Sequence, residues 1–221
     1  MKQLFLSVLA LVVAASVSAQ LSKADVFRGD VPITFLGLDF TQAKFIGNAA
    51  QYQDAGTVTN NAMREKYIPA WNGLFTDGKE QKNFKVADAV NRMDVSYATE
   101  VTAKVNRSMT NKEFFSESMD DYPRLDESKI SGLVKKYDLK GRSGVGMVFF
   151  VEGMRKGEEK GDPSYATVWV TFIDMSNNTV LLTKRVEGKA GGFGFRNFWA
   201  GAWKNVLKNM KSDWSEWKKK A

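Results

Sequence analysis

The chain of 221 residues contains no cysteine, no histidine and only four prolines. Without cysteine, neither a disulfide framework nor a cysteine nucleophile is available, so the fold must depend on a hydrophobic core. Without histidine, the Ser-His-Asp triad, a histidine general base and nearly every zinc or copper site are excluded. Any catalysis would have to use carboxylates, lysine, tyrosine or serine, and the sequence predicts neither a metal nor another cofactor.

Residues 1–19 have the pattern of a secretory signal peptide. A positive charge at Lys2 precedes an apolar run from Leu4 to Ala15, and the small residue Ala19 fits a cleavage site before Gln20. The run is shorter than the roughly 20 apolar residues that span a bilayer, and no later stretch is longer. The sequence therefore predicts an exported mature chain, periplasmic or secreted, without a transmembrane segment.

The mature chain, residues 20–221, is expected to form a single domain. Hydrophobic residues make up 43% of the sequence, which is enough to fill a core, and no low-complexity stretch resembles a linker. The chain has 32 basic and 25 acidic residues. Such an excess of positive charge can steer an anionic partner towards the chain, and the alternative is an ordinary solvent-facing helix surface with a lysine-rich end.

The amino-terminal half of this domain is predicted to mix strands with helices. Alternating bulky residues in 32–45 indicate a strand that ends near Asp39. The period of apolar residues in 57–75 indicates a helix capped by Thr59 or Asn60, which Pro69 should kink or stop near Ile68. A short helix is expected at 84–93. The alternation of apolar and polar residues in 95–105 predicts a strand with one solvent-exposed face, which favours antiparallel pairing.

The carboxy-terminal half is predicted to contain a three-stranded meander between two helices. Asp126 or Ser128 can cap a helix that runs towards Leu139, and 197–217 carries an amphipathic helix with a broad apolar stripe. The strands of the meander are expected at 144–154, 165–175 and 179–187. The fold class predicted from these elements is α+β: a mixed, mainly antiparallel sheet of about five strands with packed helices and a carboxy-terminal amphipathic helix.

The glycine-rich stretch GKAGGFGFRNFWA, which begins at Gly188, has two interpretations. Glycines before a helix can let a backbone approach a phosphate. The dinucleotide spacing G-x-G-x-x-G fails, however, because Asn197 stands where the third glycine belongs after Gly192 and Gly194. The sequence favours a simple corner between strand and helix, and a weaker anion site that involves Arg196 stays open.

The carboxy-terminal segment offers a candidate binding site. From Arg196 onward it contains seven basic residues against Asp213 and Glu216. Tryptophan rings beside lysines suit an anionic interface, where the rings are buried and the ammonium groups meet phosphate or carboxylate. The residues predicted to make this contact are Trp214, Trp217, Lys218, Lys219, Lys220 and Arg196. Nucleic acid is not expected as a partner, since the signal directs the chain away from it.

The stretch ATVWVTFIDMSNNTVLLTKRVEGKAGGFG, followed by an aromatic amphipathic helix, resembles a pattern in bacterial envelope proteins. It is similar to the α/β module of the amino-terminal domain of TolB, the curli secretion lipoprotein and the lipoprotein activators of penicillin-binding proteins. It also resembles exported proteins of unknown function from Gram-negative bacteria. The resemblance covers about residues 144–210 and implies a non-catalytic module. Unlike those lipoproteins, this chain has no lipobox cysteine for outer-membrane tethering.

Three classes of function are compatible with these features. The leading hypothesis is a non-enzymatic envelope-associated interaction module, whose partner is a protein, peptidoglycan or an anionic lipid surface. The second is a glycan or peptide hydrolase that uses two carboxylates, for which Glu152 and Asp174 are the best-placed candidates. The third is a small-molecule or lipid carrier with an apolar pocket lined by strand residues such as Val148 to Val151.

Overall fold

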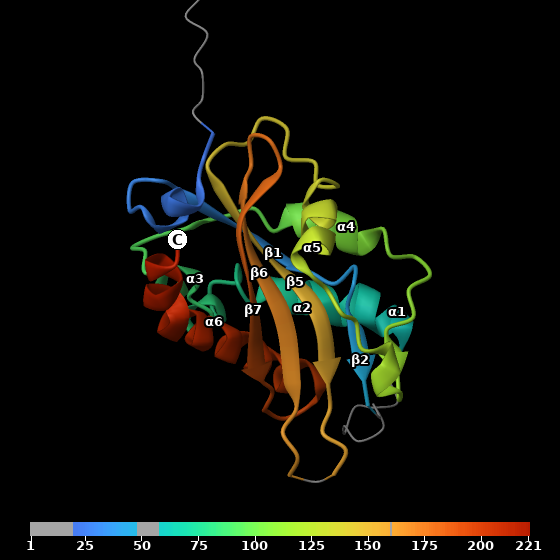
Figure 1. The fold of residues 1–221 in the computed structure, drawn as a ribbon. Coiled ribbons are helices and arrows are strands. Elements are labelled where there is room, and N and C mark those ends of the chain that lie inside the picture. The colour runs from blue at the N-terminus through green and yellow to red at the C-terminus, as the bar shows by residue number, and fades with distance from the viewer. Residues whose placement is uncertain (1–19, 48–57, 160) are drawn as a thin grey trace, which may run out of the picture.

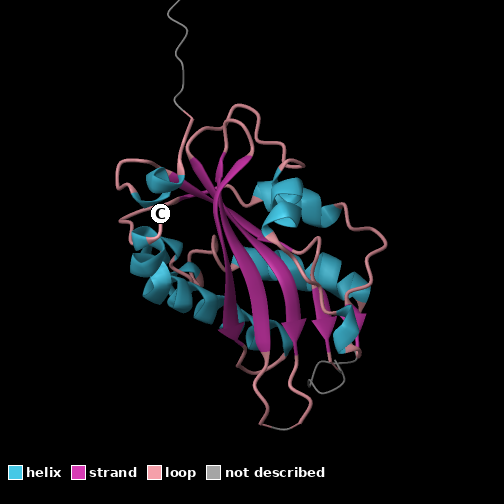
Figure 2. Cartoon of the chain, viewed as in Figure 1, coloured by secondary structure: helices cyan, strands magenta, loops and turns pink. Residues whose placement is uncertain are grey.

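The computed structural model describes residues 20–47, 58–159 and 161–221, so the predicted signal peptide lies outside the described residues. These residues form one seven-stranded sheet with helices on both faces (Figures 1 and 2). Its strands are β1 (Ile33–Asp39), β2 (Lys44–Ile46), β3 (Ser96–Tyr97), β4 (Phe115–Ser116), β5 (Val145–Arg155), β6 (Tyr165–Asp174) and β7 (Thr179–Lys189). Among the residues that the structure describes, no helix combines the length and apolarity needed to cross a bilayer.

The α-helices are α1 (Asn60–Ala62), α2 (Ile68–Gly73), α3 (Val86–Ala89), α4 (Glu100–Arg107), α5 (Glu127–Val134) and α6 (Phe195–Lys219). A π-helical turn, η4 (Met63–Tyr67), joins α1 to α2, and short 3-10 turns occur at η1 (Lys23–Phe27), η5 (Gln81–Asn83) and η6 (Met119–Asp121). The larger core lies between one face of the sheet and the helices α2, α3 and α6. A smaller core lies on the opposite face, under α4 and α5.

The first five strands are parallel, in the order β3-β1-β5-β2-β4. The antiparallel hairpin of β6 and β7 occupies the other edge of β5 along its whole length. Consequently β1 and β2 must share the remaining edge of β5, one after the other. β3 lies beside β1 and β4 beside β2, so the outermost strand is also interrupted.

The predicted mainly antiparallel sheet is therefore wrong, and the fold is a mixed α/β arrangement. The error arose at 95–105, where only Ser96 and Tyr97 form a strand and the chain then continues as α4. Its buried residues Val101, Thr102 and Asn106 lie on one helical face rather than on alternate sides. The β-branched residues that imitate a strand pattern are held in a helix because Thr102 and Asn106 bond to β1.

Other local predictions are confirmed. The first strand ends at Asp39, the meander has its three strands, and Thr59 caps the helix by accepting a hydrogen bond from the Ala62 backbone N–H. Of the two alternatives predicted near Ile68, a kink or a stop, the stop is wrong, because the helix continues to Gly73. In the preceding π-turn the Ile68 N–H bonds to the Met63 carbonyl five residues back, a wider turn that accommodates the following proline ring. The predicted helix at 84–93 is limited to α3.

Side chains replace the missing strand beside β1. Where the outer strand is interrupted by α4, the β1 backbone between Leu36 and Phe40 would be left without partners on that side. Two backbone N–H groups donate to asparagine side chains: Leu38 N–H to Asn72 Oδ1 and Phe40 N–H to Asn106 Oδ1, each at 2.8 Å. Two backbone carbonyls accept from side chains: Leu38 from Asn106 Nδ2 at 2.8 Å and Leu36 from Thr102 Oγ1 at 2.7 Å. This set of three polar side chains, Asn72, Thr102 and Asn106, is called the β1 clamp below.

The far edge of the sheet is covered by α6, which lies along β7 (Figure 1). Asn205 and Asn209 donate hydrogen bonds from their amides to the carbonyls of Lys189 and Glu187, each at 2.7 Å. Gly188, which lies between Glu187 and Lys189 on β7, has no side chain, so the backbone of α6 can approach β7 closely. A Cβ there would lie 2.1 Å from the Ala202 carbonyl oxygen.

Candidate functional site

Trp214 and Trp217 lie in the core rather than on the surface. They are 6% and 7% exposed, respectively. The ring of Trp214 packs against Phe27 at a centroid distance of 4.8 Å and against Phe172 at 5.7 Å. The two tryptophans therefore anchor the end of α6 to the sheet and do not present their rings to a partner.

The charged residues predicted with them are separated by the fold. Lys218, Lys219 and Lys220 are exposed on the last turn of α6, where Lys220 pairs with Glu216. Arg196 lies at the opposite end of the same helix. Its guanidinium donates two hydrogen bonds to the Glu80 carboxylate, at 3.0 and 2.6 Å, so Glu80 balances the positive charge of Arg196.

The glycine-rich stretch forms the predicted corner between β7 and α6. Gly192 and Gly194 have φ angles of 138° and 75°, a region that side chains disfavour. The Gly191 N–H bonds to the Phe198 carbonyl, which folds the corner back on the first turn of the helix. These glycines serve the backbone path and the packing of α6.

Glu152 is a buried structural carboxylate. It is 2% exposed and accepts hydrogen bonds from the Leu125 N–H at 2.9 Å, the Trp169 Nε1 at 3.1 Å and the Arg185 Nε at 2.7 Å. With three donors committed, its oxygens have little capacity left for a substrate. Glu152 holds the loop before α5, β6 and β7 together.

Asp174 has a similar role at the other end of the sheet. It is 1% exposed and accepts hydrogen bonds from the Leu21 N–H, from the backbone and hydroxyl of Ser176, and from Asn177. Asp174 lies opposite Val145, seven positions before Glu152 on β5. At about 3.4 Å per residue the two carboxylates are roughly 24 Å apart, too far for joint glycoside hydrolysis, which needs about 5 to 10 Å.

Strand residues 148–151 are fully buried in the two cores and line neither of the two pockets described below. Within the described ranges, no three carboxylates come together in a way that could hold a metal ion. The structure therefore does not bring together the candidate residues of the hydrolase or of the strand-lined carrier. Three other parts of the structure gather charged or polar side chains.

The first is a buried acid–base cluster at the end of β1. Asp39 is 2% exposed and accepts hydrogen bonds from the Tyr137 hydroxyl at 2.5 Å and from the backbone and hydroxyl of Thr41. Burial raises the pKa of the Asp39 carboxyl despite these hydrogen bonds. Lys112 donates to the Thr41 carbonyl at 3.0 Å, and burial, aided by the charge of Lys44, lowers its pKa to about 8.

Lys112 should make stability depend on pH in alkaline solution. The folded state releases the lysine proton near pH 8, whereas the unfolded chain holds it up to the ordinary pKa of 10.5. Between pH 8 and pH 10 the unfolded state binds more protons, so the free energy of unfolding rises with pH. Urea titrations across this range should show a smaller rise in Lys112→Met, with the slope intact in the exposed control Lys136→Met. An unchanged slope in Lys112→Met would contradict this assignment.

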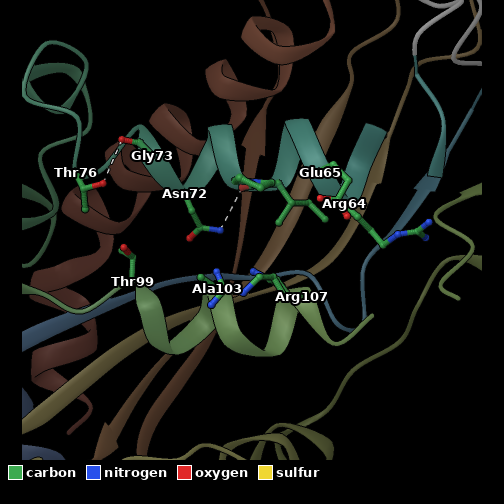
Figure 3. Close-up of a pocket in the computed structure, with 11 residues that line it drawn as sticks. Arg64, Glu65, Asn72, Gly73, Thr76, Thr99, Ala103 and Arg107 are labelled. Carbon is green, nitrogen blue, oxygen red and sulfur yellow. Dashed lines mark hydrogen bonds between the residues drawn. The ribbon is translucent and has the colours of Figure 1, made fainter. Parts of the chain in front are cut away.

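The second feature is a pocket of about 480 Å³ between α2 and α4, at the edge of the sheet that the β1 clamp covers (Figure 3). Thr76 and Thr99 lie at one end, and Arg64, Glu65 and Arg107 at the other. Asn72 points from α2 into the space between the two helices. The pocket lies at the opposite edge of the sheet from β7.

The third feature is a groove of about 560 Å³ between the η5–α3 segment and α6, called the lysine groove below. Its five lysines are exposed, and none makes an ion pair within the described part of the chain. They are Lys82, Lys85, Lys204, Lys208 and Lys211.

Sequence reasoning missed the lysine groove, because none of the predicted binding residues lines it. The spacing of Lys204, Lys208 and Lys211 by four and three residues places them on one face of α6, a signal that was available in the sequence. The contribution of Lys82 and Lys85 depends on a tertiary contact between α3 and α6 across more than 100 residues. No local pattern predicts such a contact.

Comparison with known proteins adds no identification. A scan against protein-family models found no match, and searches of curated proteins and of solved structures found no significant similarity. The resemblance to envelope modules such as the amino-terminal domain of TolB therefore stays a prediction. The function has to be argued from the surface itself.

Proposed function

We propose that this protein is a non-enzymatic interaction module, exported to the cell envelope, which binds an anionic envelope surface through the lysine groove. The observation that carries the proposal is the convergence of five lysines without ion pairs on one groove. The buried tryptophans of α6 pack in the larger core and do not line the groove.

The charge of the groove is unbalanced by its own lining. Asp88 is the one acidic residue among the described residues that line it, which leaves a net charge of four positive units from the side chains named above. Like charges held close together repel one another, and the repulsion is relieved when an anionic partner binds. Near an anionic lipid surface each lysine contributes about 1 kcal/mol, so the five together suffice for reversible docking.

The groove is also held in place by packing. Val86 and Ala89 of α3 are buried in the larger core, as are Val206, Leu207 and Met210 of α6. Lys204, Lys208 and Lys211 therefore project from a packed helix, and Lys82 and Lys85 project from the segment that leads into the packed α3. This arrangement favours the groove over Lys218, Lys219 and Lys220, which lie on the terminal turn beside Glu216.

The non-enzymatic part of the proposal is supported by the hydrogen bonds and the positions of the candidate carboxylates. Glu152 and Asp174 have their oxygens occupied by backbone and side-chain donors, and they lie at opposite ends of the sheet. Asp39 is buried behind Tyr137. The chain has no histidine or cysteine that could replace them.

Co-sedimentation tests the proposal. The purified protein is mixed with vesicles of phosphatidylcholine, with vesicles containing phosphatidylglycerol, and with peptidoglycan sacculi, each at low and high salt. The triple variant Lys204→Gln, Lys208→Gln, Lys211→Gln removes three charges from the groove. The matched triple variant Lys218→Gln, Lys219→Gln, Lys220→Gln removes three charges from the end of the same helix.

We expect binding to an anionic target at low salt, at least tenfold weaker binding by the groove variant, and little change in the terminal variant. High salt should weaken binding of the unmodified protein because the contact is electrostatic. If the terminal variant loses binding and the groove variant keeps it, the terminal lysines are the site and the groove is not. If the unmodified protein binds none of the three targets, the proposal is wrong.

A further inference from the structure

The pocket between α2 and α4 exists because the outermost strand is interrupted there. One wall is a face of the continuous helix from α1 to α2, and the other wall is α4, which replaces the strand. Gly73 and Ala103 face the gap, and a Cβ added at Gly73 would meet no atom within 4 Å. Small residues at these positions leave the space between the two helices unfilled.

The floor of the pocket is fixed by the β1 clamp. Asn72 and Asn106 line the pocket and are 7% and 5% exposed. Their amides are committed to the backbone of Leu38 and Phe40, so neither side chain can change its rotamer without leaving buried backbone groups unpaired. The cavity is therefore preformed, as ligand pockets usually are.

The pocket is polar at both ends and apolar between them. Arg64, Glu65 and Arg107 lie at one end, and Thr76 and Thr99 lie at the other (Figure 3). Ile68 and Pro69 occupy the helical turn between these ends, opposite Ala103.

Neither arginine of the pocket makes an ion pair within the described residues. Arg64 donates to the Lys112 carbonyl at 3.4 Å, and its remaining N–H groups are available. A guanidinium group is suited to a carboxylate, which accepts its hydrogen bonds in a bidentate geometry. Glu65 at the same end of the pocket can accept from an amide or ammonium group of the same ligand.

From these contacts we infer that the pocket binds an amphipathic carboxylate of about the size of a tripeptide. Its carboxylate is bound by Arg107 at the charged end of the pocket, and its apolar part lies against Ile68, Pro69 and Ala103. A volume of about 480 Å³ is within the usual range for small-ligand sites. The inference does not depend on the lysine groove, which lies between other helices.

Two sources can supply this chemistry, a short peptide with a free carboxyl terminus and a fatty acid. The probes are therefore a mixture of N-acetylated tripeptides with free carboxyl groups, the same mixture as carboxamides, and decanoate. Binding to the purified protein is followed by titration calorimetry. It is also followed through the side-chain amide signals of Asn72 and Asn106 in ¹⁵N-correlated spectra, which report on the floor of the pocket.

Two variants address the pocket. Arg107→Gln removes one carboxylate partner. Gly73→Leu fills the cavity, and its matched control is Gly132→Leu on α5, a helical glycine with open space around it that does not line the pocket. Both glycine replacements remove a residue that disfavours helix, so both are expected to fold.

We expect saturable shifts of both asparagine signals with the carboxylate peptides or with decanoate, and at least tenfold weaker binding of the carboxamides. Affinity should fall at least tenfold in Gly73→Leu and in Arg107→Gln and stay unchanged in Gly132→Leu. The probe that binds more tightly identifies the source. Equal binding of acids and carboxamides, or no saturable shift with any probe, would overturn the inference, and neither result bears on vesicle binding by the lysine groove.

Discussion

Replacing Gly188 by alanine is expected to lower the free energy of unfolding by at least about 3 kcal/mol. The added Cβ would lie 2.1 Å from the Ala202 carbonyl oxygen, 2.8 Å from Val206 Cγ2 and 2.9 Å from the Val206 nitrogen. Two of these atoms belong to the backbone of α6, so no change of rotamer relieves the overlap. The helix would have to move away from β7, and the hydrogen bonds of Asn205 and Asn209 would be lost with it.

Urea denaturation measures this effect, with Gly191→Ala as the matched control. Gly191 lies in the same corner before α6, and a Cβ there would meet no atom within 4 Å. Its replacement should change stability by less than about 1 kcal/mol. If both variants lose the same stability, the close approach of α6 to β7 is not what requires glycine at position 188.

Replacing Glu152 by leucine is expected to destabilise the fold by about 3 kcal/mol, because it removes one partner of a buried charged hydrogen-bond network. The Leu125 N–H and the indole N–H of Trp169 would lose their acceptor. Arg185 would lose the carboxylate at 2.7 Å, although its own half-exposed side chain can turn to water. The loop before α5 should loosen from the sheet.

The control for Glu152 is Glu187, an exposed carboxylate that also lies near Arg185, at 3.5 Å. Glu187→Leu should change the free energy of unfolding by no more than about 0.5 kcal/mol, as is usual for exposed ion pairs. Thermal and urea denaturation of the two variants gives the comparison. If the Glu152→Leu protein is as stable as the unmodified one, the structural role assigned to Glu152 is wrong.

The elements that could be predicted from the sequence are those specified by nearby residues. The turn between β6 and β7, the apolar stripe of α6 and the caps at Thr59 and Asp126 all depend on spacings of a few residues. The apolar stripe was predicted for 197–217, and in the structure it packs in the larger core. That packing includes Trp214 and Trp217.

The parallel pairing could not be predicted in this way, although one signal was present. Seven of seven residues in β1 and ten of eleven in β5 are buried or half-buried, the near-continuous pattern of parallel strands covered on both faces. The alternation in 95–105 outweighed that signal and led to an antiparallel interpretation. The helix there is stabilised by Thr102 and Asn106 against a strand more than 60 residues earlier, which no local window contains.

The candidate sites were even less accessible from sequence. The lysine groove and the α2–α4 pocket each join segments that are far apart in the chain. Glu152 and Asp174 were notable as acids in apolar strands, but residue type alone does not distinguish a catalytic carboxylate from one that is saturated by buried donors. Only the positions of Leu125, Trp169 and Leu21 show the difference.

The pairing of β1 with β5 also affects how the chain is made. β1 leaves the ribosome more than 100 residues before Val145, the first of its partners in β5. At typical synthesis rates of about 5 to 20 residues per second, the apolar run of β1 waits on the order of 5 to 20 s without its neighbour. During that interval the nascent chain is exposed to misfolding and is a natural client for a chaperone, whereas the meander and α6 can form as soon as they are synthesised.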